Sequence, residues 1–356
     1  MSLEQRLKAQ IAAEGPLTVA QYMTACLHDP RDGYYATRPR LGQGGDFLTA
    51  PLVSQMFGEL LGLWAVETWM RMGQPAPFLL VEAGPGDGTL ISDVLRAARL
   101  APAFLAAARL HLIETSPPLI EAQRLRLAGA PLEPTWIAGL AALPAGAPVI
   151  LLSNELLDCL PARQFVRTMR GWGERMVGLD QHGELAFGLA TRPLERVLPD
   201  AEPGEVLEIS AAQEAFGAEL GAILARQGGA ALLIDYGRGE PGTGDTLQAL
   251  KDHRMLSPLE SPGHADLTVH ADFPAVAAAA RGAGAHTAPI LTQGELLARL
   301  GIAERAQSLI RTRPDRAGTV QRQLARLTDP DQMGELFKAL ALHAPAALVP
   351  PGFEES

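Results

Sequence analysis

Short apolar runs alternate with amphipathic segments through the middle of the chain. The runs are continuous and brief, as in a parallel sheet covered on both faces, and they predict strands at 78–83, 110–114, about 134–138, 148–153 and 230–235. Apolar residues at helical spacing predict helices between them, at 89–99, 117–128 and 208–227. Repeated strand–helix units of this length favour an α/β fold with a doubly wound, Rossmann-like parallel sheet.

The flanking segments follow other patterns. Helices are predicted at 3–13, 18–27 and 54–72, and Thr18 is placed to cap the second. Short alternating runs with glycine turns between Gln164 and Leu189 predict an antiparallel β insertion. After residue 240 comes a loop rich in glycine and proline. Helical patterns follow at 274–283, 292–300, 303–311 and 315–328, whereas the run 337–342 fits a strand or a helix equally well.

These patterns predict three parts of the chain. Residues 1–75 are expected to form a helical N-terminal segment with a Gly-Asp-Phe loop. Residues 76–240 would form the core, with its β insertion at about 164–205, and residues 241–356 a mainly helical region that completes the sheet. A length of 356 residues suits one large α/β domain with a substantial appendage.

Composition narrows the function classes. A net charge of −10 argues against nucleic acid as the main partner, because phosphate binding needs a clustered basic face. Two distant cysteines without a CxxC pair argue against a disulfide framework or a cysteine-bound zinc. No stretch approaches the ~20 apolar residues that span a bilayer, so no membrane insertion is expected. The N-terminus lacks a secretory signal, which favours a reducing compartment. The oligomeric state stays open.

A glycine-rich turn joins the first predicted strand of the core to its helix. The segment Glu82–Thr89 places Gly84, Gly86 and Gly88 where a ligand can press against the main chain, next to the free N–H groups of a helix start. Glycine falls one place early for the dinucleotide pattern G-x-G-x-x-G, and the phosphate loop G-x-x-x-x-G-K-[ST] is absent. S-adenosylmethionine, which carries no phosphate, fits this spacing better.

Acidic or amide side chains end four of the predicted strands, namely Glu82, Glu114, Asn154-Glu155 with Asp158 close behind, and Asp235. Ligands of open α/β sheets bind outside the carboxyl ends of the strands, so these groups predict a site at that edge. From the end of the second strand, Glu114 can accept hydrogen bonds from both hydroxyls of a ribose. The alternative role for such carboxylates is to cap helices.

With these residues in place, the chain resembles the MidA-like methyltransferases over nearly its whole length. The likeness rests on many segments, chiefly Asp29–Tyr35, Gly45–Pro51, Glu82–Leu90, Glu114–Pro117, Asn154–Pro161, Ile234–Gly237, Asp266–Thr268 and Pro350–Phe353. The chain departs from the family at Leu52, where an acid is common, and at Ala83, where leucine is usual. The first departure puts a substrate role for position 52 in doubt.

The resemblance implies an S-adenosylmethionine-dependent methyltransferase that acts on an arginine of a protein substrate. The family's mitochondrial relatives are complex I assembly factors that symmetrically dimethylate an arginine, so a respiratory complex I subunit is the expected partner. The expected location is the cytoplasm of a bacterium, or the mitochondrial matrix if the source is a eukaryote. The resemblance implies no metal.

For an arginine substrate, two carboxylates would hold the planar guanidinium by paired hydrogen bonds. Glu155 and Asp158 are the predicted catalytic pair, with Asn154 orienting the substrate or the cofactor. The predicted cofactor contacts are Glu82, Gly84, Gly86, Gly88, Glu114, Asn154 and Asp46. Asp46 would close over the cofactor from its glycine loop, or else only stabilise its own turn.

Three other functions remain open on the sequence alone. The chain could methylate a small molecule instead of a protein. It could also be an assembly chaperone that retains the fold while its catalysis is dispensable. An NAD(P) dehydrogenase is the least favoured, because the glycine spacing is wrong for it.

Overall fold

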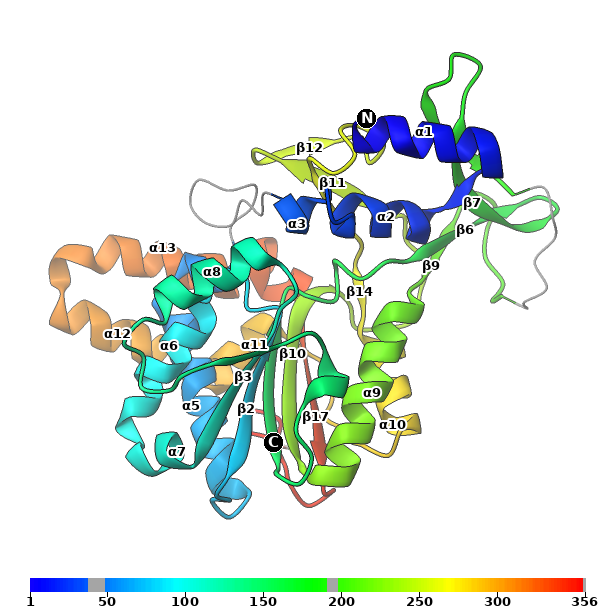
Figure 1. Cartoon of the computed structure of the whole chain (residues 1–356). Helices are drawn as coiled ribbons and strands as arrows, with labels where there is room; N and C mark the ends of the chain where they lie inside the picture. The colour runs from blue at the N-terminus through cyan, green and yellow to red at the C-terminus, as the bar shows by residue number, and fades with distance from the viewer. Residues whose placement is uncertain (38–48, 191–197, 355–356) are drawn as a thin grey trace.

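The computed structural model describes residues 1–37, 49–190 and 198–354, and a parallel sheet forms its centre (Figure 1). The parallel strands, in their spatial order, are β4 (Thr135–Ile137), β3 (Ala108–Ile113), β2 (Phe78–Ala83), β5 (Val149–Asn154) and β10 (Gly229–Arg238). The chain runs outward from β2 to β4 and returns to the other side of β2 with β5. The topological switch point therefore lies between β2 and β5.

The far side of the sheet is antiparallel. β17 (Phe337–Ala344) pairs with β10, which decides the ambiguous run at 337–342 in favour of a strand. Two-residue strands β15 (His286–Thr287) and β16 (Leu291–Thr292) pair with β17 in turn. At the carboxyl end of β10, the two-residue strand β14 (Ala271–Asp272) pairs with it in parallel.

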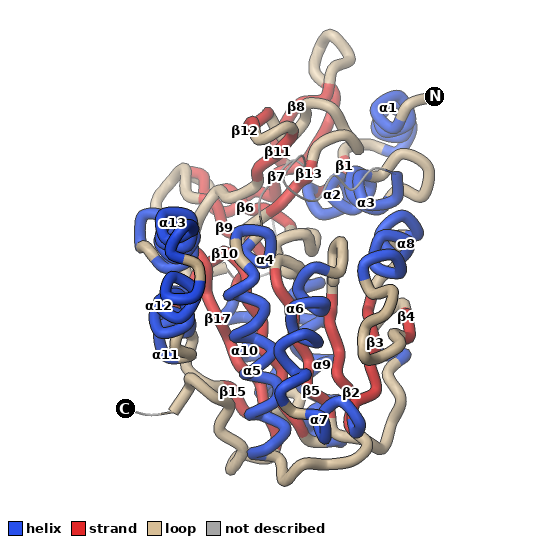
Figure 2. Tube along the Cα trace, turned by 90° about the vertical axis from the view of Figure 1, so that its left-hand side faces the viewer, coloured by secondary structure: helices blue, strands red, loops and turns tan. Residues whose placement is uncertain are grey.

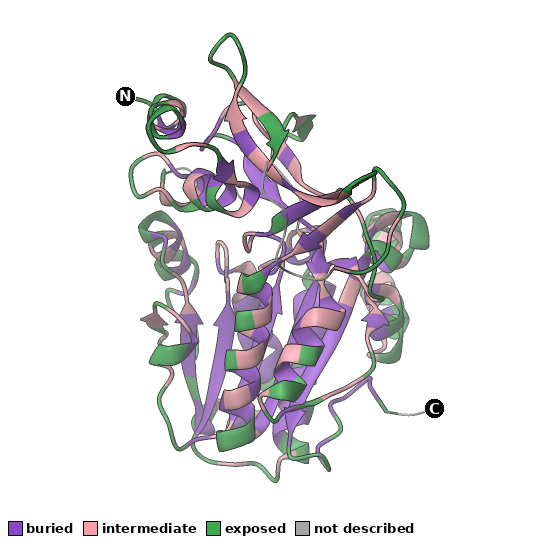
Figure 3. Cartoon of the chain, turned by 90° about the vertical axis from the view of Figure 1, so that its right-hand side faces the viewer, coloured by how far each residue is buried: buried purple, intermediate pink, exposed green. Residues whose placement is uncertain are grey.

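Successive residues of the core strands enter hydrophobic cores on opposite faces of the sheet. In β2, Phe78 and Leu80 belong to one core, and Leu79 and Val81 to the other. This double burial explains why the strands read as continuous apolar runs. The first face is covered by α5 (Gln55–Arg71), α6 (Thr89–Ala97), α7 (Pro102–Ala107), α11 (Gln293–Arg299), α12 (Ile302–Thr312) and α13 (Ala317–Thr328) (Figure 2). The second is covered by α9 (Ala211–Gln227) and α10 (Phe273–Gly282) (Figure 3).

Three segments far apart in the sequence form a cap, which lies above the sheet in Figure 1. They are the N-terminal elements α1 (Leu3–Glu14), β1 (Leu17–Thr18), α2 (Val19–His28) and α3 (Tyr34–Thr37), the insertion strands β6 (Arg163–Thr168), β7 (Gly171–Leu179), β8 (Leu185–Leu189) and β9 (Val206–Ile209), and the small sheet of β11 (Gln248–Lys251), β12 (Arg254–Leu256) and β13 (Asp266–Thr268). All three segments contribute to one hydrophobic core, to which Tyr22, Val177 and Leu267 belong.

The helices predicted at 3–13 and 18–27 and the antiparallel insertion are confirmed in this cap, whereas the helix predicted at 54–72 is α5, which covers the sheet. Thr18 caps α2, since its hydroxyl accepts the Gln21 N–H at 3.1 Å while the Gln21 side chain returns to the Thr18 N–H. β6, β7 and β8 pair antiparallel in sequence order. β1 joins them by pairing with β7, which brings residue 17 beside residue 177. None of the described helices has the length and apolar character needed to cross a membrane.

Two parts of the cap differ from the sequence prediction. Helical periodicity places 208–227 in one helix, but residues 206–209 form β9, which pairs with β6. The stretch after residue 240 reads as a loop, yet it contains β11 and β12 and leads to β13. Strands of three or four residues carry too little alternation to be recognised, and the partners of β9 are about forty residues away.

The contact between α9 and α10 provides a test of the core packing. A Cβ placed on Gly221 would lie 2.6 Å from the Ala280 carbonyl oxygen and 2.8 Å from its Cα. We expect Gly221→Ala to destabilise the protein by about 1–3 kcal/mol, although alanine is the better helix former. Gly282→Ala in α10 is the control, because its Cβ would meet nothing within 4 Å. Thermal unfolding of both variants is the measurement, and equal midpoints would contradict this packing.

Candidate functional site

A cavity of about 940 Å³ lies between the carboxyl edge of the parallel sheet and the cap. The cap contributes His28, Tyr35 and Met255 to its lining. Most of the predicted site residues line it from the sheet side, namely Glu82, Gly84, Gly86, Glu114, Asn154, Glu155 and Asp158. Gly88 is not among the lining residues. Asp46 lies outside the described residues, so the structure does not place it.

The glycine turn after β2 follows the path that its sequence predicts. Gly84 and Gly86 have φ values of +69° and +53°, a conformation that L side chains rarely adopt. A Cβ on Gly84 would also lie 3.0 Å from Leu156 Cδ1. Asp87 closes the turn, because its carboxylate accepts the Thr89 N–H at 3.0 Å and the Thr89 hydroxyl at 2.7 Å. The turn is therefore set by the chain itself and presents its backbone to the cavity.

Glu82 is a buried carboxylate at the end of β2. Its side chain is 2% exposed, and Oε2 has no hydrogen-bond partner among the described residues. Burial raises the pKa of Glu82 to about 8, and the negative charge of Asp87 adds to the rise. A buried carboxylate oxygen without a partner is costly, so this position suits a cationic ligand group.

Glu114 is held rigidly at the end of β3. Its Oε1 accepts the N–H groups of Thr115 and Ser116, both at 2.8 Å, and its Oε2 accepts a hydrogen bond from Gln123 Nε2 at 3.2 Å. Burial raises the pKa of this half-buried carboxyl. The helix that follows, α8 (Pro117–Arg126), is capped by Ser116. Glu114 therefore does not serve as the cap of α8, and its carboxylate lines the cavity.

The loop after β5 carries the predicted catalytic residues. Glu155 has φ +54°, and its Oε1 accepts hydrogen bonds from the Ala50 N–H at 3.1 Å and from Asn154 Nδ2 at 2.9 Å. Burial raises the pKa of Glu155 to about 8, and the charge of Asp158 adds to this rise. Asp158 is 4% exposed, and its Oδ1 has no partner in the described chain. No helix begins at 155–160, so Asp158 caps none.

Hydrogen bonds on both sides of Leu157 fix this loop. Asp235 Oδ2 accepts the N–H groups of Leu157 and Asp158, at 2.8 and 3.2 Å. Gln213 Nε2 donates to the Leu157 carbonyl at 2.8 Å. Asp235 is fully buried, and burial together with the charges of Asp158 and Glu155 raises its pKa well above the usual range. Glu155 and Asp158 of the loop and Asp235 of β10 thus form a group of three carboxyl groups whose negative charges would repel one another.

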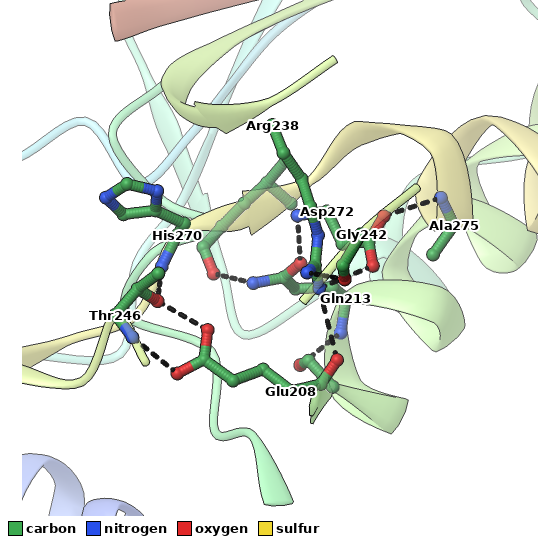
Figure 4. A network of polar contacts seen from close by, with 10 residues as sticks. Glu208, Gln213, Arg238, Gly242, Thr246, His270, Asp272 and Ala275 are labelled. Atoms are coloured by element: carbon green, nitrogen blue, oxygen red, sulfur yellow. Dashed lines mark hydrogen bonds and ion pairs between the residues drawn. The ribbon is translucent and has the colours of Figure 1, made fainter. Parts of the chain in front are cut away.

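A wider polar network supports Gln213 from the side of the cap (Figure 4). The Asp272 N–H donates to Gln213 Oε1 at 2.8 Å, and Arg238 Nη2 donates to Asp272 Oδ2 at the same distance. Arg238 also donates to the Glu208 carbonyl in β9, and the Glu208 carboxylate accepts the Thr246 N–H. The network therefore joins β9, β10, β14 and α9 to the loop that carries Glu155 and Asp158.

Sequence reasoning missed three residues that line or support the cavity. The Tyr35 hydroxyl lies 2.8 Å from Cys159 Sγ and donates to Asp266 Oδ1 at 3.1 Å. Gln123, at 0% exposure, contacts the glycine turn. Tyr35 and Asp266 lie within segments that carry the family resemblance, but the sequence assigns neither of them a role in the site. Gln123 gave no signal, because a glutamine on a helix reads as an ordinary surface residue.

The geometry agrees with what comparison with known proteins shows. The family model described as "Putative S-adenosyl-L-methionine-dependent methyltransferase" matches residues 60–291, which include β2, β3, β5 and the glycine turn. The chain belongs to this methyltransferase family. The cofactor of the methyltransferase is S-adenosylmethionine, and the assignment excludes the dehydrogenase alternative.

The similarity to named relatives extends over almost the whole chain. The Danio rerio protein named "Protein arginine methyltransferase NDUFAF7, mitochondrial" is 35% identical, over 95% of this chain and 86% of the relative. The Homo sapiens protein of the same name is 36% identical, over 95% and 82%. A crystal structure from Burkholderia thailandensis bound to S-adenosyl-homocysteine shares 27% identity and a TM-score of 0.85, over 99% of this chain and 93% of that one. The predicted α/β fold, enzyme class and cofactor are thus confirmed.

The raised pKa of Glu82 predicts how stability depends on pH. In the folded protein without cofactor, this carboxyl keeps its proton up to a pKa of about 8, whereas in the unfolded chain it loses the proton near 4.5. Folding therefore binds a proton between these values, so the stabilisation is lost progressively as the pH rises from about 4.5 to about 8 and no further above that. We expect the unfolding midpoint to fall between about pH 5 and 8, and to fall less steeply in Glu82→Gln. Glu121→Gln, exposed on α8, is the control. Identical slopes in all three proteins would refute the raised pKa.

Proposed function

We propose that the methyltransferase methylates an arginine side chain of a protein substrate. The observation that carries this proposal is the acidic cluster at the ends of β5 and β10. Glu155 and Asp158 line the cavity, and each raises the cost of ionising its neighbours. Asp158 also keeps a buried oxygen without a partner. A planar cation that donates several hydrogen bonds would relieve both costs at once.

An arginine guanidinium has this chemistry. It is always charged, and its five N–H donors match two carboxylates that bind it by paired hydrogen bonds. We propose that Glu155 and Asp158 hold the guanidinium so that one terminal nitrogen points toward the cofactor, and that Asn154 orients the neighbouring atoms. The substrate cation would lower the pKa of Glu155, because it favours the ionised form. Glu155 is then placed to accept the proton that the nitrogen loses.

The other side of the cavity is proposed to hold the cofactor. The unpartnered oxygen of Glu82 suits the ammonium end of S-adenosylmethionine, and the backbone at Gly84 and Gly86 allows close approach. Glu114 is proposed to accept the ribose hydroxyls, while Gly88 shapes the turn. Asp46, which lies outside the described residues, is proposed to close over the cofactor. The bound cofactor supplies an electrophilic methyl group. The chain itself aligns the guanidinium with that group and keeps water away, which are the main contributions to an in-line displacement.

The relatives support the substrate class, since they are named protein arginine methyltransferases. The finer proposal is symmetric dimethylation of an arginine in a respiratory complex I subunit, and it rests on the resemblance to the MidA-like family. The bacterial cytoplasm, or the mitochondrial matrix in a eukaryote, is the corresponding place of action. The names of the relatives include the word mitochondrial.

Conservative variants of the acidic loop test the arginine proposal. We expect Glu155→Gln and Asp158→Asn each to lower methyl transfer at least 100-fold, because the guanidinium loses a charged partner. Their affinities for S-adenosyl-homocysteine should stay within about threefold of the parent. The assay incubates each protein with labelled S-adenosylmethionine and an extract of cells that lack the gene, and mass spectrometry then locates the labelled methyl groups.

The same assay distinguishes the competing functions. Label on arginine that depends on Glu155 and Asp158 supports the proposal, and Glu121→Gln should behave as the parent does. Label on lysine or on a small molecule would overturn the arginine assignment. If the cells lose complex I without the gene but recover it with Glu155→Gln, partner binding rather than catalysis is the essential activity. Unchanged arginine methylation of complex I subunits in cells without the gene would refute that substrate.

A further inference from the structure

Gln123 connects the two halves of the cofactor site. Its side-chain Nε2 donates to the Gly86 carbonyl at 2.7 Å and to Glu114 Oε2 at 3.2 Å. Its Oε1 accepts the indole N–H of Trp136, on β4, at 2.7 Å. Gln123 is 0% exposed. One buried amide therefore contacts the glycine turn after β2, the carboxylate after β3 and the strand β4.

The chemistry of the three partners fixes which way this amide points. An indole N–H is only a donor, so the glutamine oxygen must face Trp136. A carbonyl and an ionised carboxylate are only acceptors, so the NH2 group must face Gly86 and Glu114. A flipped amide would place donor against donor and acceptor against acceptor in a buried position, which costs free energy at each contact. Trp136 thereby orients the donors of Gln123.

The glycine turn is also shaped to receive Gln123. A Cβ on Gly88 would lie 3.4 Å from Gln123 Cγ and 3.5 Å from its Cα, which places this glycine against α8. Gly88 itself has φ +82°. A Cβ at these distances would make ordinary van der Waals contact, so it is the positive φ of Gly88 that favours glycine here, and the turn lies directly against the helix that carries Gln123.

We infer that Gln123 is a positioning residue for S-adenosylmethionine, which holds the glycine turn and the Glu114 carboxylate in one fixed relation; this rests on the proposed role of Glu114 as the acceptor of the ribose hydroxyls. Glu114 Oε1 is held by two backbone N–H groups, and Gln123 holds Oε2, so the plane of the carboxylate is determined. Two hydroxyls on adjacent ribose carbons need such a fixed plane to donate to one carboxylate. Gln123 does not line the cavity, so it would act through Glu114 and the glycine turn rather than on the reacting atoms.

Calorimetric titration with S-adenosyl-homocysteine tests the inference without any substrate. We expect Gln123→Glu to raise the Kd at least 30-fold, because a carboxylate would face the Gly86 oxygen and Glu114. Gln123→Leu, which removes the donors, should raise it at least tenfold. Trp136→Phe keeps the aromatic ring but frees the amide, and it should raise the Kd about three- to tenfold. Glu121→Gln, two residues away on the exposed side of α8, should leave it unchanged.

A second ligand separates positioning from general damage. In the parent protein, the 2′-deoxyribose analogue of S-adenosyl-homocysteine should bind more weakly than S-adenosyl-homocysteine, because it lacks one hydroxyl. In Gln123→Leu and Trp136→Phe this difference should shrink, since the carboxylate is no longer held. Equal weakening of both ligands would show a merely structural role, and a Kd within threefold of the parent in Gln123→Glu would overturn the inference. If Gln123→Leu does not fold, the ratio of the two ligands' Kd values in Trp136→Phe provides the test.

Discussion

The hydrogen bonds that Asp235 accepts from Leu157 and Asp158 are the constraint on which the site depends. They hold the chain in a turn at the end of β5, where Glu155 takes a positive φ. The cost of this arrangement is that three carboxyl groups share a buried region, where burial and the charge of Asp158 raise the pKa of both Glu155 and Asp235. A protein that needed only a stable turn would gain nothing from such a cluster. A protein that receives a cation at this place gains a site whose charge is already arranged.

The cap gives the site its second wall and much of its rigidity. Gln213 supports Leu157 from α9, and Asp272 supports Gln213 from the segment that leads into α10. On the opposite side, the Ser116 hydroxyl donates to the Tyr35 carbonyl at 2.6 Å, which joins the N-terminal segment to the turn after β3. The cavity is thus enclosed by contacts between parts of the chain that are far apart in sequence. Its shape depends on both the sheet and the cap.

The sequence predicted the core well, for a physical reason. Strands buried on both faces leave continuous apolar runs, and the polar residues that end them, such as Glu82 and Asn154, are easily seen. The cap was only partly predictable, since β9, β11 and β12 are too short to show a period. The partners of Glu114 were not predictable either. Gln123 of α8 could face solvent or the glycine turn, depending on how the helix is rotated against the sheet. The amino-acid composition of the helix does not reveal this rotation.

The shared core of the cap has a consequence for the order in which the protein can form. Leu7 and Met23 lie near the N-terminus, but the core that buries them also contains Val177, Leu267 and Val269. During synthesis, the apolar faces of α1 and α2 must therefore wait until some 240 further residues have left the ribosome. The glycine turn can form early in synthesis, whereas the cap is completed late. A nascent chain that stops before β13 would expose these faces and be a substrate for chaperones.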